Sequence, residues 1–593
     1  MQRQNHLHKE KSTDQYTAAS TGRVETQLPL VNPLAFHMTD WVLGPDGKPL
    51  FMGTSSNWAF GRRVLNMTHM RCTGHTLSNE GLLFDSAVYD LKWDGNRFRS
   101  SDYAFEISDL PTRDHAIYLI NSVKFHCGRL FYLFDEDIFM ERFASFHEDP
   151  HGFAQRSPLW YVHYLLILAF GKVFLAQTRK SQQPVGTELF VQAMKLMPDF
   201  TYYNADPVEE TQVLCCVALW LQCLNHRPAA HRVIGQALRT ALSCGMHTEM
   251  RSPYLNKDYV ERCRTVWWTI YVLERQITSL LGVPPGIAEE SISTPFPELP
   301  GQTQKLIALR IQVQLSQILA KIDQTVYGRD GKLDGRYIGA TQLVLRDIAE
   351  VTQRLESSLD LHANEAMSGI SRVSAHLHLQ LHQCIVLTTR PLLYIFLQSR
   401  LGQSRVAPMQ WIQSESVKSL IQICIDSAQQ MLRVLSLLQD QGLLENFLTF
   451  DLDAAFISAL TILMAAAVDS SLLPDHSPWS QCAYTILGGM ALHGNKIAEL
   501  NLKELRLLES ELDQILAHDS QVLPADSMLA SDPQPNEASL DLSLDTASSD
   551  PLSQHLGLSF SDWNYELSSD QLINIADSLD TDQLGWPFGE LAG

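Results

Sequence analysis

A histidine-rich run is the strongest candidate for metal chemistry in this chain of 593 residues. The run holds His376, His378 and His382, and the last two lie one helical turn apart, the spacing that two zinc ligands on one helix face require. A zinc protease would place Glu directly after the first of these ligands, but Leu379 stands there and no third ligand follows within reach. The pattern therefore favours histidines on a partly buried helix, and we assign no metal site and no cofactor.

Cysteine and serine patterns also argue against catalysis. Five of the ten cysteines fall between residues 215 and 263, but the chain contains no Cys-x-x-Cys pair. Core helices use Cys as a small apolar residue, and a reducing compartment fits this usage. A Gly-x-Ser-x-Gly nucleophile elbow and a phosphate loop ending in Gly-Lys-Ser or Gly-Lys-Thr are missing as well. We therefore expect a protein that is not an enzyme.

Large apolar side chains stand among carboxylates near the C-terminus. Residues 507–593 hold 17 of the 66 acidic residues and no Lys or Arg, so much of the net charge of −21 lies there. Beyond residue 519 the composition shifts to Ser, Asp and Pro, which predicts a disordered acidic tail over 520–593. Such a tail can dock an induced helix into a partner groove. The contacts expected to do so are Phe560, Trp563, Tyr565, Leu567, Trp586 and Phe588.

Apolar stripes at helical spacing organise the rest of the chain. One helix is expected from Arg232, with Gly245 as its left-handed cap, and a second from Asp258 to Leu281, with a capping box of Asp258 and Glu261. Gly282 and Pro284 end the second helix. Further helices are predicted at 305–326, 340–359, 370–398, 414–439, 451–468 and 479–516. This pattern indicates an all-α, α-solenoid-like body.

The predicted domain scheme has three parts. Residues 1–31 lack periodicity and are expected to be disordered. Residues 32–519 form the helical body, with a loop-rich part at 32–150, a core at 157–300 and further helices at 305–516. Residues 520–593 are the tail. The apolar runs 159–176 and 453–468 are interpreted as buried helices rather than membrane spans, since the first holds His163 and Lys172 and the second falls short of the ~20 residues of a span.

Several short motifs of the body resemble the regulatory domain of fungal zinc-cluster transcription factors, the fungal-specific transcription factor domain. They lie at 243–247, 261–268, 273–275, 281–287 and 390–393, with another match at 51–60. Two departures are visible: Glu274 precedes Arg275 where the family has Asp, and Val283 stands where it has Arg. The residues that carry the resemblance are Gly245, His247, Arg264, Trp267, Trp268, Arg275, Gly282, Pro284, Arg390 and Pro391.

The resemblance implies a nuclear, pathway-specific activator of RNA polymerase II genes, such as a catabolic or secondary-metabolite cluster. Its implied partners are coactivators or the transcription machinery at the tail, together with a small-molecule inducer. The family's zinc cluster needs six cysteines before the regulatory domain, but Cys72 is the one cysteine before residue 127. We therefore expect promoter recognition through a DNA-binding partner, or through a zinc cluster encoded upstream. The alternatives are a DNA-free co-regulator and, less favoured, a metabolic enzyme.

Overall fold

The fold is taken from a computed structural model. It describes residues 34, 40–43, 49–77, 88–97, 110–176, 183–203, 205–328, 335–359, 370–402, 414–522 and 567–579. The predicted disorder of residues 1–31 lies outside these ranges, as do the tail residues Phe560, Trp563, Tyr565, Trp586 and Phe588.

Helices dominate the described residues, and the predicted all-α class is confirmed. The first half contains α1 (Asn57–Thr73), α2 (Arg113–His126), α3 (Glu136–Glu148), α4 (Pro150–Arg156), α5 (Pro158–Phe174), α6 (Thr187–Leu196), α7 (Pro207–Cys223), α8 (Arg227–Ser243) and α9 (Lys257–Leu281). The second half contains α10 (Thr303–Thr325), α11 (Gly335–Ser358), α12 (Arg372–Arg400), α13 (Glu415–Asp440), α14 (Thr449–Val468), α15 (Ser477–Leu492), α16 (Lys496–Val522) and α18 (Ser569–Ser578). A two-stranded antiparallel ribbon, β1 (Asp40–Leu43) and β2 (Pro49–Met52), precedes them.

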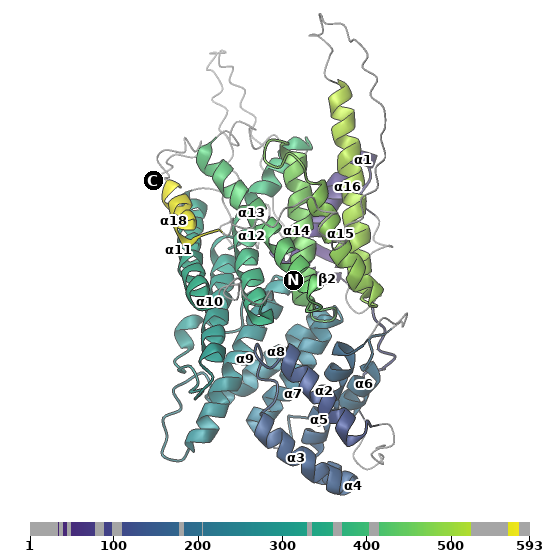
Figure 1. Ribbon diagram of the computed structural model, residues 1–593, viewed down its shortest axis with the longest axis vertical. Helices are drawn as coiled ribbons and strands as arrows, with labels where there is room; N and C mark the ends of the chain where they lie inside the picture. The colour runs from purple at the N-terminus through teal and green to yellow at the C-terminus, as the bar shows by residue number, and fades with distance from the viewer. Residues whose placement is uncertain are drawn as a thin grey trace, which may run out of the picture.

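Consecutive helices pack on one another along most of the chain. Contacts run from α7 to α8, α9, α10, α11, α12, α13, α14, α15 and α16 in turn. In Figure 1 helices α2–α7 gather at one end of the elongated molecule and α11–α16 at the other, with α8–α10 between them. Helix α1 returns to the far end and packs against α16 and α14. A single apolar core joins both ends.

The two apolar runs lie inside this core. Helix α14 is long and apolar enough to cross a membrane, but 89% of its most apolar window is buried by the surrounding protein. In α5 the side chains of residues 159–171 are buried as well, His163 among them. The Nε2 of His163 donates to the carbonyl oxygen of Leu133 at 2.9 Å, so this buried ring has a hydrogen-bond partner. Both runs are core helices of the body.

Two sequence-based expectations about helix ends differ from the structure. Within 32–150, the described residues include α1, α2 and α3. The expected helix 479–516 is two helices, because the chain turns at Gly494, whose φ is +93°. Helix α9 begins two residues earlier than an N-cap at Asp258 would place it, and Asn256 is its N-cap, accepting a bond from the amide of Asp258 at 3.0 Å. Within the tail, the described residues 567–579 include α18.

Candidate functional site

The C-terminal half of α9 and the loop after it are joined by a buried charge cluster. Arg275 and Glu274 are each 3% exposed, and Nη1 of Arg275 donates to the Glu274 carboxylate at 2.7 Å. Nη2 of Arg275 donates to the carbonyl of Ile287 at 2.7 Å and to Glu289 at 3.0 Å. The amide of Gly286 donates to the second Glu274 oxygen at 2.7 Å. Each charge thus has a partner, as burial of charges requires.

The electrostatics of this cluster hold the loop in place. Burial alone would lower the pKa of Arg275, but Glu274, Tyr271 and Glu289 together outweigh burial and the pKa is raised. The guanidinium also lies 4.7 Å from the ring centre of Tyr271. The Tyr271 hydroxyl donates to Glu289. The Glu-Arg pair at 274–275 therefore fixes the chain after Pro284, which itself is exposed.

Residues at the start of α9 and around it also have structural contacts. Trp267 is fully buried, and Trp268 donates from Nε1 to the carbonyl of Pro295 at 3.2 Å. Arg264 donates to Glu261 at 2.6 Å. The carbonyl of His247 accepts two amides, from Ser293 at 2.9 Å and Thr294 at 3.1 Å. Gly245, at φ +71°, ends α8 as expected. None of these side chains is free to stack on a base.

Arg390 and Pro391 lie inside α12 and connect it to the N-terminal match. Arg390 is fully buried, and its Nε donates to the Tyr327 hydroxyl at 2.8 Å. Its two terminal nitrogens reach Asn57 Oδ1 at 2.7 Å and the carbonyl of Ser55. Its guanidinium lies 4.4 Å from the centre of the Phe60 ring. The residues that the sequence singled out at 51–60 and 390–391 are therefore brought together.

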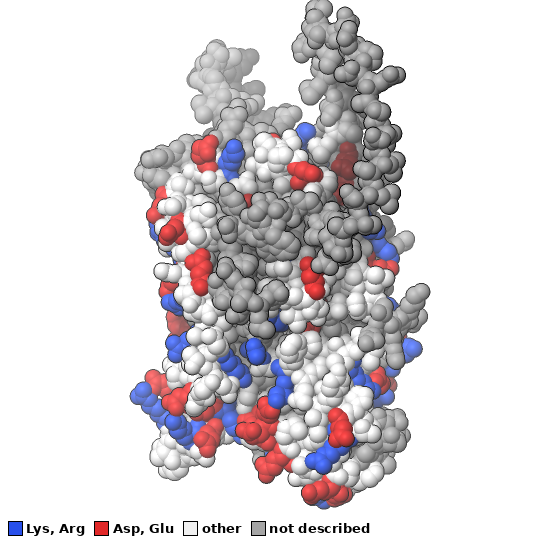
Figure 2. Space-filling model, viewed as in Figure 1, with Lys and Arg blue, Asp and Glu red and all other residues white. Residues whose placement is uncertain are grey.

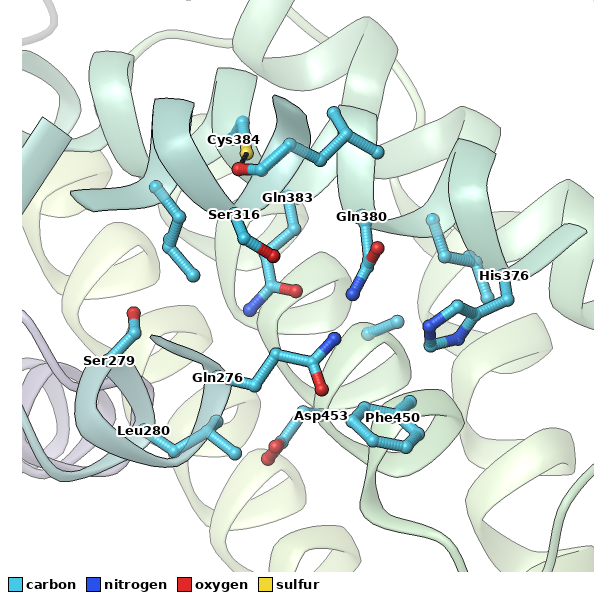
Figure 3. A pocket seen from close by; sticks show the side chains of 14 residues that line it. Gln276, Ser279, Leu280, Ser316, His376, Gln380, Gln383, Cys384, Phe450 and Asp453 are labelled. Carbon is cyan, nitrogen blue, oxygen red and sulfur yellow. Dashed lines mark hydrogen bonds between the residues drawn. The ribbon is translucent and has the colours of Figure 1, made fainter. Parts of the chain in front are cut away.

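A pocket opens beside the Glu274–Arg275 cluster, between α9, α10, α12 and α14 (Figure 3). Its volume is about 40 Å³, enough for a few water molecules or one small polar group. Figure 3 shows the side chains of Gln276, Gln380 and Gln383 converging on its centre, with His376 and Asp453 at its edge. Its apolar walls come from Leu280, Leu315, Leu319, Leu379, Cys384, Phe450 and Ala454.

Several polar atoms at this pocket lack partners within the part of the chain that the structure describes. They are both amide atoms of Gln276, Oε1 of Gln380 and both ring nitrogens of His376. Gln276 is 7% exposed and His376 is fully buried. Buried polar atoms without partners are rare in folded proteins, and a ligand or ordered water commonly accounts for them. The pocket therefore offers amide donors and acceptors to a small guest.

The titratable groups at the pocket suit binding better than catalysis. Burial lowers the pKa of His376 to about 3, so its imidazole is neutral and a weak base at neutral pH. Burial raises the pKa of the Cys384 thiol to about 12, which keeps it out of the reactive thiolate form. Burial also raises the pKa of Asp453 to about 6. The neutral amides at the centre of the pocket match an uncharged polar group of a ligand, whereas Asp453 at its edge is largely ionised at neutral pH.

The histidine run is more buried than the sequence indicates. His378 and His382 are 6% and 4% exposed, and Nδ1 of His378 bonds the Ser374 carbonyl within α12 at 2.8 Å. Among the described residues, no group of three or more His, Cys, Asp or Glu side chains is placed to hold a metal ion. Sequence reasoning missed the pocket role of His376 and Gln380, and also Gln276. The sequence signal that could have identified these pocket residues was the presence of Gln and His on otherwise apolar helix faces.

Comparison with known proteins agrees with these motifs. Residues 119–308, from α2 into α10, match the fungal specific transcription factor domain. An uncharacterized transcriptional regulatory protein of Schizosaccharomyces pombe is 23% identical over 68% of this chain and 51% of its own length. The thiamine repressible genes regulatory protein thi1 of the same yeast is 22% identical over 52% of this chain and 40% of its own.

Activator of stress genes 1 of Saccharomyces cerevisiae is 26% identical over 32% of this chain and 20% of its own length. The chain thus spans about half or less of the length of these relatives. The comparison with solved structures gives no match.

Proposed function

We infer that this chain, which carries a fungal specific transcription factor domain, is a fungal transcription regulator. The observation that carries this inference is that the matched region coincides with consecutive helices of the body, from α2 through α9 into α10. The names of the relatives describe regulators of transcription and not enzymes. The neutral His376 and protonated Cys384 thiol at the pocket are in keeping with that choice.

In the finer proposal, the chain acts in the nucleus as a pathway-specific activator, and its tail recruits coactivators or the transcription machinery. One relative is named for thiamine-repressible genes and another as an activator of stress genes, which supports control of a limited gene set. A catabolic or secondary-metabolite cluster is such a set. The pocket between α9, α10, α12 and α14 is the proposed site for an uncharged small-molecule inducer.

Promoter recognition is proposed to depend on a DNA-binding partner protein or on a zinc cluster encoded upstream. Residues 1–506 carry few net charges, since the acidic excess lies mostly after residue 507. Figure 2 shows basic and acidic side chains mixed over the visible face of the described body, without a patch of one sign. A protein that captures DNA directly needs clustered Lys and Arg to neutralise phosphates. A co-regulator that reaches promoters through its partner is the second candidate function.

A reporter assay tests the activator proposal. Residues 520–593, tethered to a foreign DNA-binding domain, should activate a reporter gene. Joint replacement of Phe560, Trp563, Tyr565 and Leu567 by Ala should remove most of that activity, because the apolar groups make the partner contacts while the net charge stays the same. The matched control replaces Ser548, Ser553, Ser559 and Ser561 by Ala. Equal activity of the aromatic variant and this control would contradict the proposal.

A further inference from the structure

The acidic tail places one helix on the body. Helix α18, yellow in Figure 1, lies against α11 and also contacts α13, although well over a hundred residues separate it from either in sequence. Leu572, Ala576 and Leu579 are fully buried, and Leu567 is 8% exposed. They lie at helical spacing on one face, while Asp570, Asn574 and Asp577 are exposed. The tail thus contributes an amphipathic helix that the body covers.

Polar contacts fix the position of α18 at its C-terminal end. Arg346 of α11 donates to Asp577 at 2.8 Å, and Gln342 of α11 donates to the carbonyl of Leu579. Ser416 of α13 donates to the carbonyl of Ser578 at 3.0 Å. We call the surface formed by Gln342, Arg346 and Ser416, with the apolar side chains beneath α18, the docking face. A basic residue against the C-terminal half of an acidic helix is complementary in charge.

Helix α18 has features of a segment that can dissociate from the docking face. Ten residues are too few for a stable isolated helix in water, even with the capping box of Ser568 and Gln571 that begins α18. Its helical form therefore depends on the docking face. The Arg346–Asp577 pair is about half exposed on both sides, so it adds selectivity more than strength. Ordering a short segment offsets much of what its burial gains.

Leu567 connects this contact to activation. It belongs to the apolar set from which the sequence predicts partner contacts, yet the body buries it next to α18. A side chain cannot face the body and a coactivator at once. Binding of a partner across this part of the tail therefore competes with docking, and a helix that is ordered on one surface can be ordered on another.

We propose that the docking face is a binding site for an amphipathic acidic helix, that α18 occupies it in cis, and that the tail engages its partner only when α18 leaves. The partner role of the tail rests on the proposed activator function, whereas the docking itself does not. Because α18 is tethered, it meets the docking face at an effective concentration of the order of millimolar, and a competitor must exceed that advantage.

A binding experiment on the full chain tests the docking. A fluorescent peptide of residues 566–580 is titrated into the wild-type chain and into the chain carrying Leu572→Asp, which cannot dock its own α18 but keeps the docking face. The peptide should bind the variant at least about tenfold more tightly, because the site has been vacated. The control chain carries Asn574→Asp on the exposed face of α18 and should match wild type. Equal binding to all three chains, or none, would overturn the proposal.

A charge exchange shows that the peptide uses the expected surface. Adding Arg346→Glu to the Leu572→Asp chain should weaken peptide binding, and a peptide with Asp577→Arg should recover it. Circular dichroism of each chain confirms that the body remains folded, so weak binding cannot be confused with unfolding. A peptide that is insensitive to both charge changes binds elsewhere, which would also overturn the proposal.

A reporter assay separates this proposal from the proposed function. The full chain and the isolated tail, each fused to a foreign DNA-binding domain, are compared with the full chain carrying Gln342→Ala and Arg346→Glu, which leave the tail unchanged. The body variant should be about threefold or more active than the wild-type chain. An inactive isolated tail contradicts the activator function but does not affect the docking of α18, which the peptide-binding experiment tests separately. If the isolated tail is active but the body variant is no more active than the wild-type chain, the proposed competition between docking and partner binding is overturned.

Discussion

At the scale of single residues, two arginines that carry the resemblance join separate segments of the chain through buried hydrogen bonds. Arg275 joins α9 to the loop at 286–289, and Arg390 joins α12 to the chain at 55–57. The resemblance singles out these arginines in the sequence. Their hydrogen-bond partners lie up to 335 residues away, so no local sequence pattern predicts them. Burial of a hydrogen-bonded arginine favours one arrangement, because losing a partner leaves a costly unpaired group.

Asp323 lies beside Arg390 and makes folding depend on pH. Burial raises its pKa to about 7, above the value near 3.8 that it has when unfolded. The neutral form is therefore favoured in the folded protein, and stability contributed by this group falls as pH rises from about 4 to about 7. The substitution Asp323→Asn removes this loss of stability at higher pH, because an amide does not ionise. The stability of the variant relative to wild type should increase by up to about 4 kcal/mol between pH 4 and pH 8.

Urea unfolding at pH 5 and pH 8 measures this difference. Other buried carboxylates are present in both proteins and cancel in the comparison. Asp114→Asn, at an exposed position in the first turn of α2, is the control for the loss of one exposed carboxyl group. A variant whose advantage over wild type stays constant, or shrinks as pH rises, would show that Asp323 is charged in the folded protein.

At the scale of elements, helix positions were largely readable from apolar periodicity, and helix ends were less so. Helix α9 fits the stripe from Cys263 to Leu281, but the amide of Asp258 is capped by Asn256, which the polar loop concealed. Helix α18 was not predicted from the sequence, because the apolar periodicity of ten residues within an acidic segment is a weak signal for a helix. The pocket could not be predicted, since Gln276, His376 and Asp453 come from three helices whose pairing is set by long-range packing.

The end of α9 is locked against the N-terminal segment by two glycines. The amide of Gly53 donates to the carbonyl of Leu281 at 3.0 Å, and a Cβ on Gly282 would lie 2.5 Å from the carbonyl oxygen of Gly53. Gly282 also has φ +73°, which disfavours other residues. Gly282→Ala should therefore destabilise the protein through both strain and overlap, the overlap adding roughly 1–3 kcal/mol.

Gly74 provides the matched control for this prediction. It ends α1 with φ +77°, but a Cβ there would meet nothing within 4 Å. Gly74→Ala should cost only the left-handed strain, roughly 1–2 kcal/mol. Denaturant unfolding compares the two variants, and hydrogen exchange of the Gly53 amide reports the local contact. Similar losses in both variants, with the Gly53 amide still protected, would mean that the two segments separate at little cost.

At the scale of the whole molecule, the pocket is where both ends of the body meet. Helix α9 belongs to the matched domain, whereas α12 and α14 lie beyond it in the chain. A guest that bonds Gln276 together with Gln380 would therefore tie the two halves to each other. Anything that binds the folded state alone raises its stability by mass action. Ligand binding here should stabilise the body as one unit rather than a single helix pair.

Thermal unfolding with small probes tests this expectation. Acetamide and formamide are small enough for the pocket and present uncharged donors and acceptors that match the unpartnered amide and imidazole atoms, and each should raise the Tm of the wild-type chain with increasing concentration. Gln276→Leu removes the central amide and should abolish the shift. Gln324→Leu, on an exposed position of α10, should keep it. Equal shifts in both variants would place the probes elsewhere, and the pocket would then hold water as part of the fold.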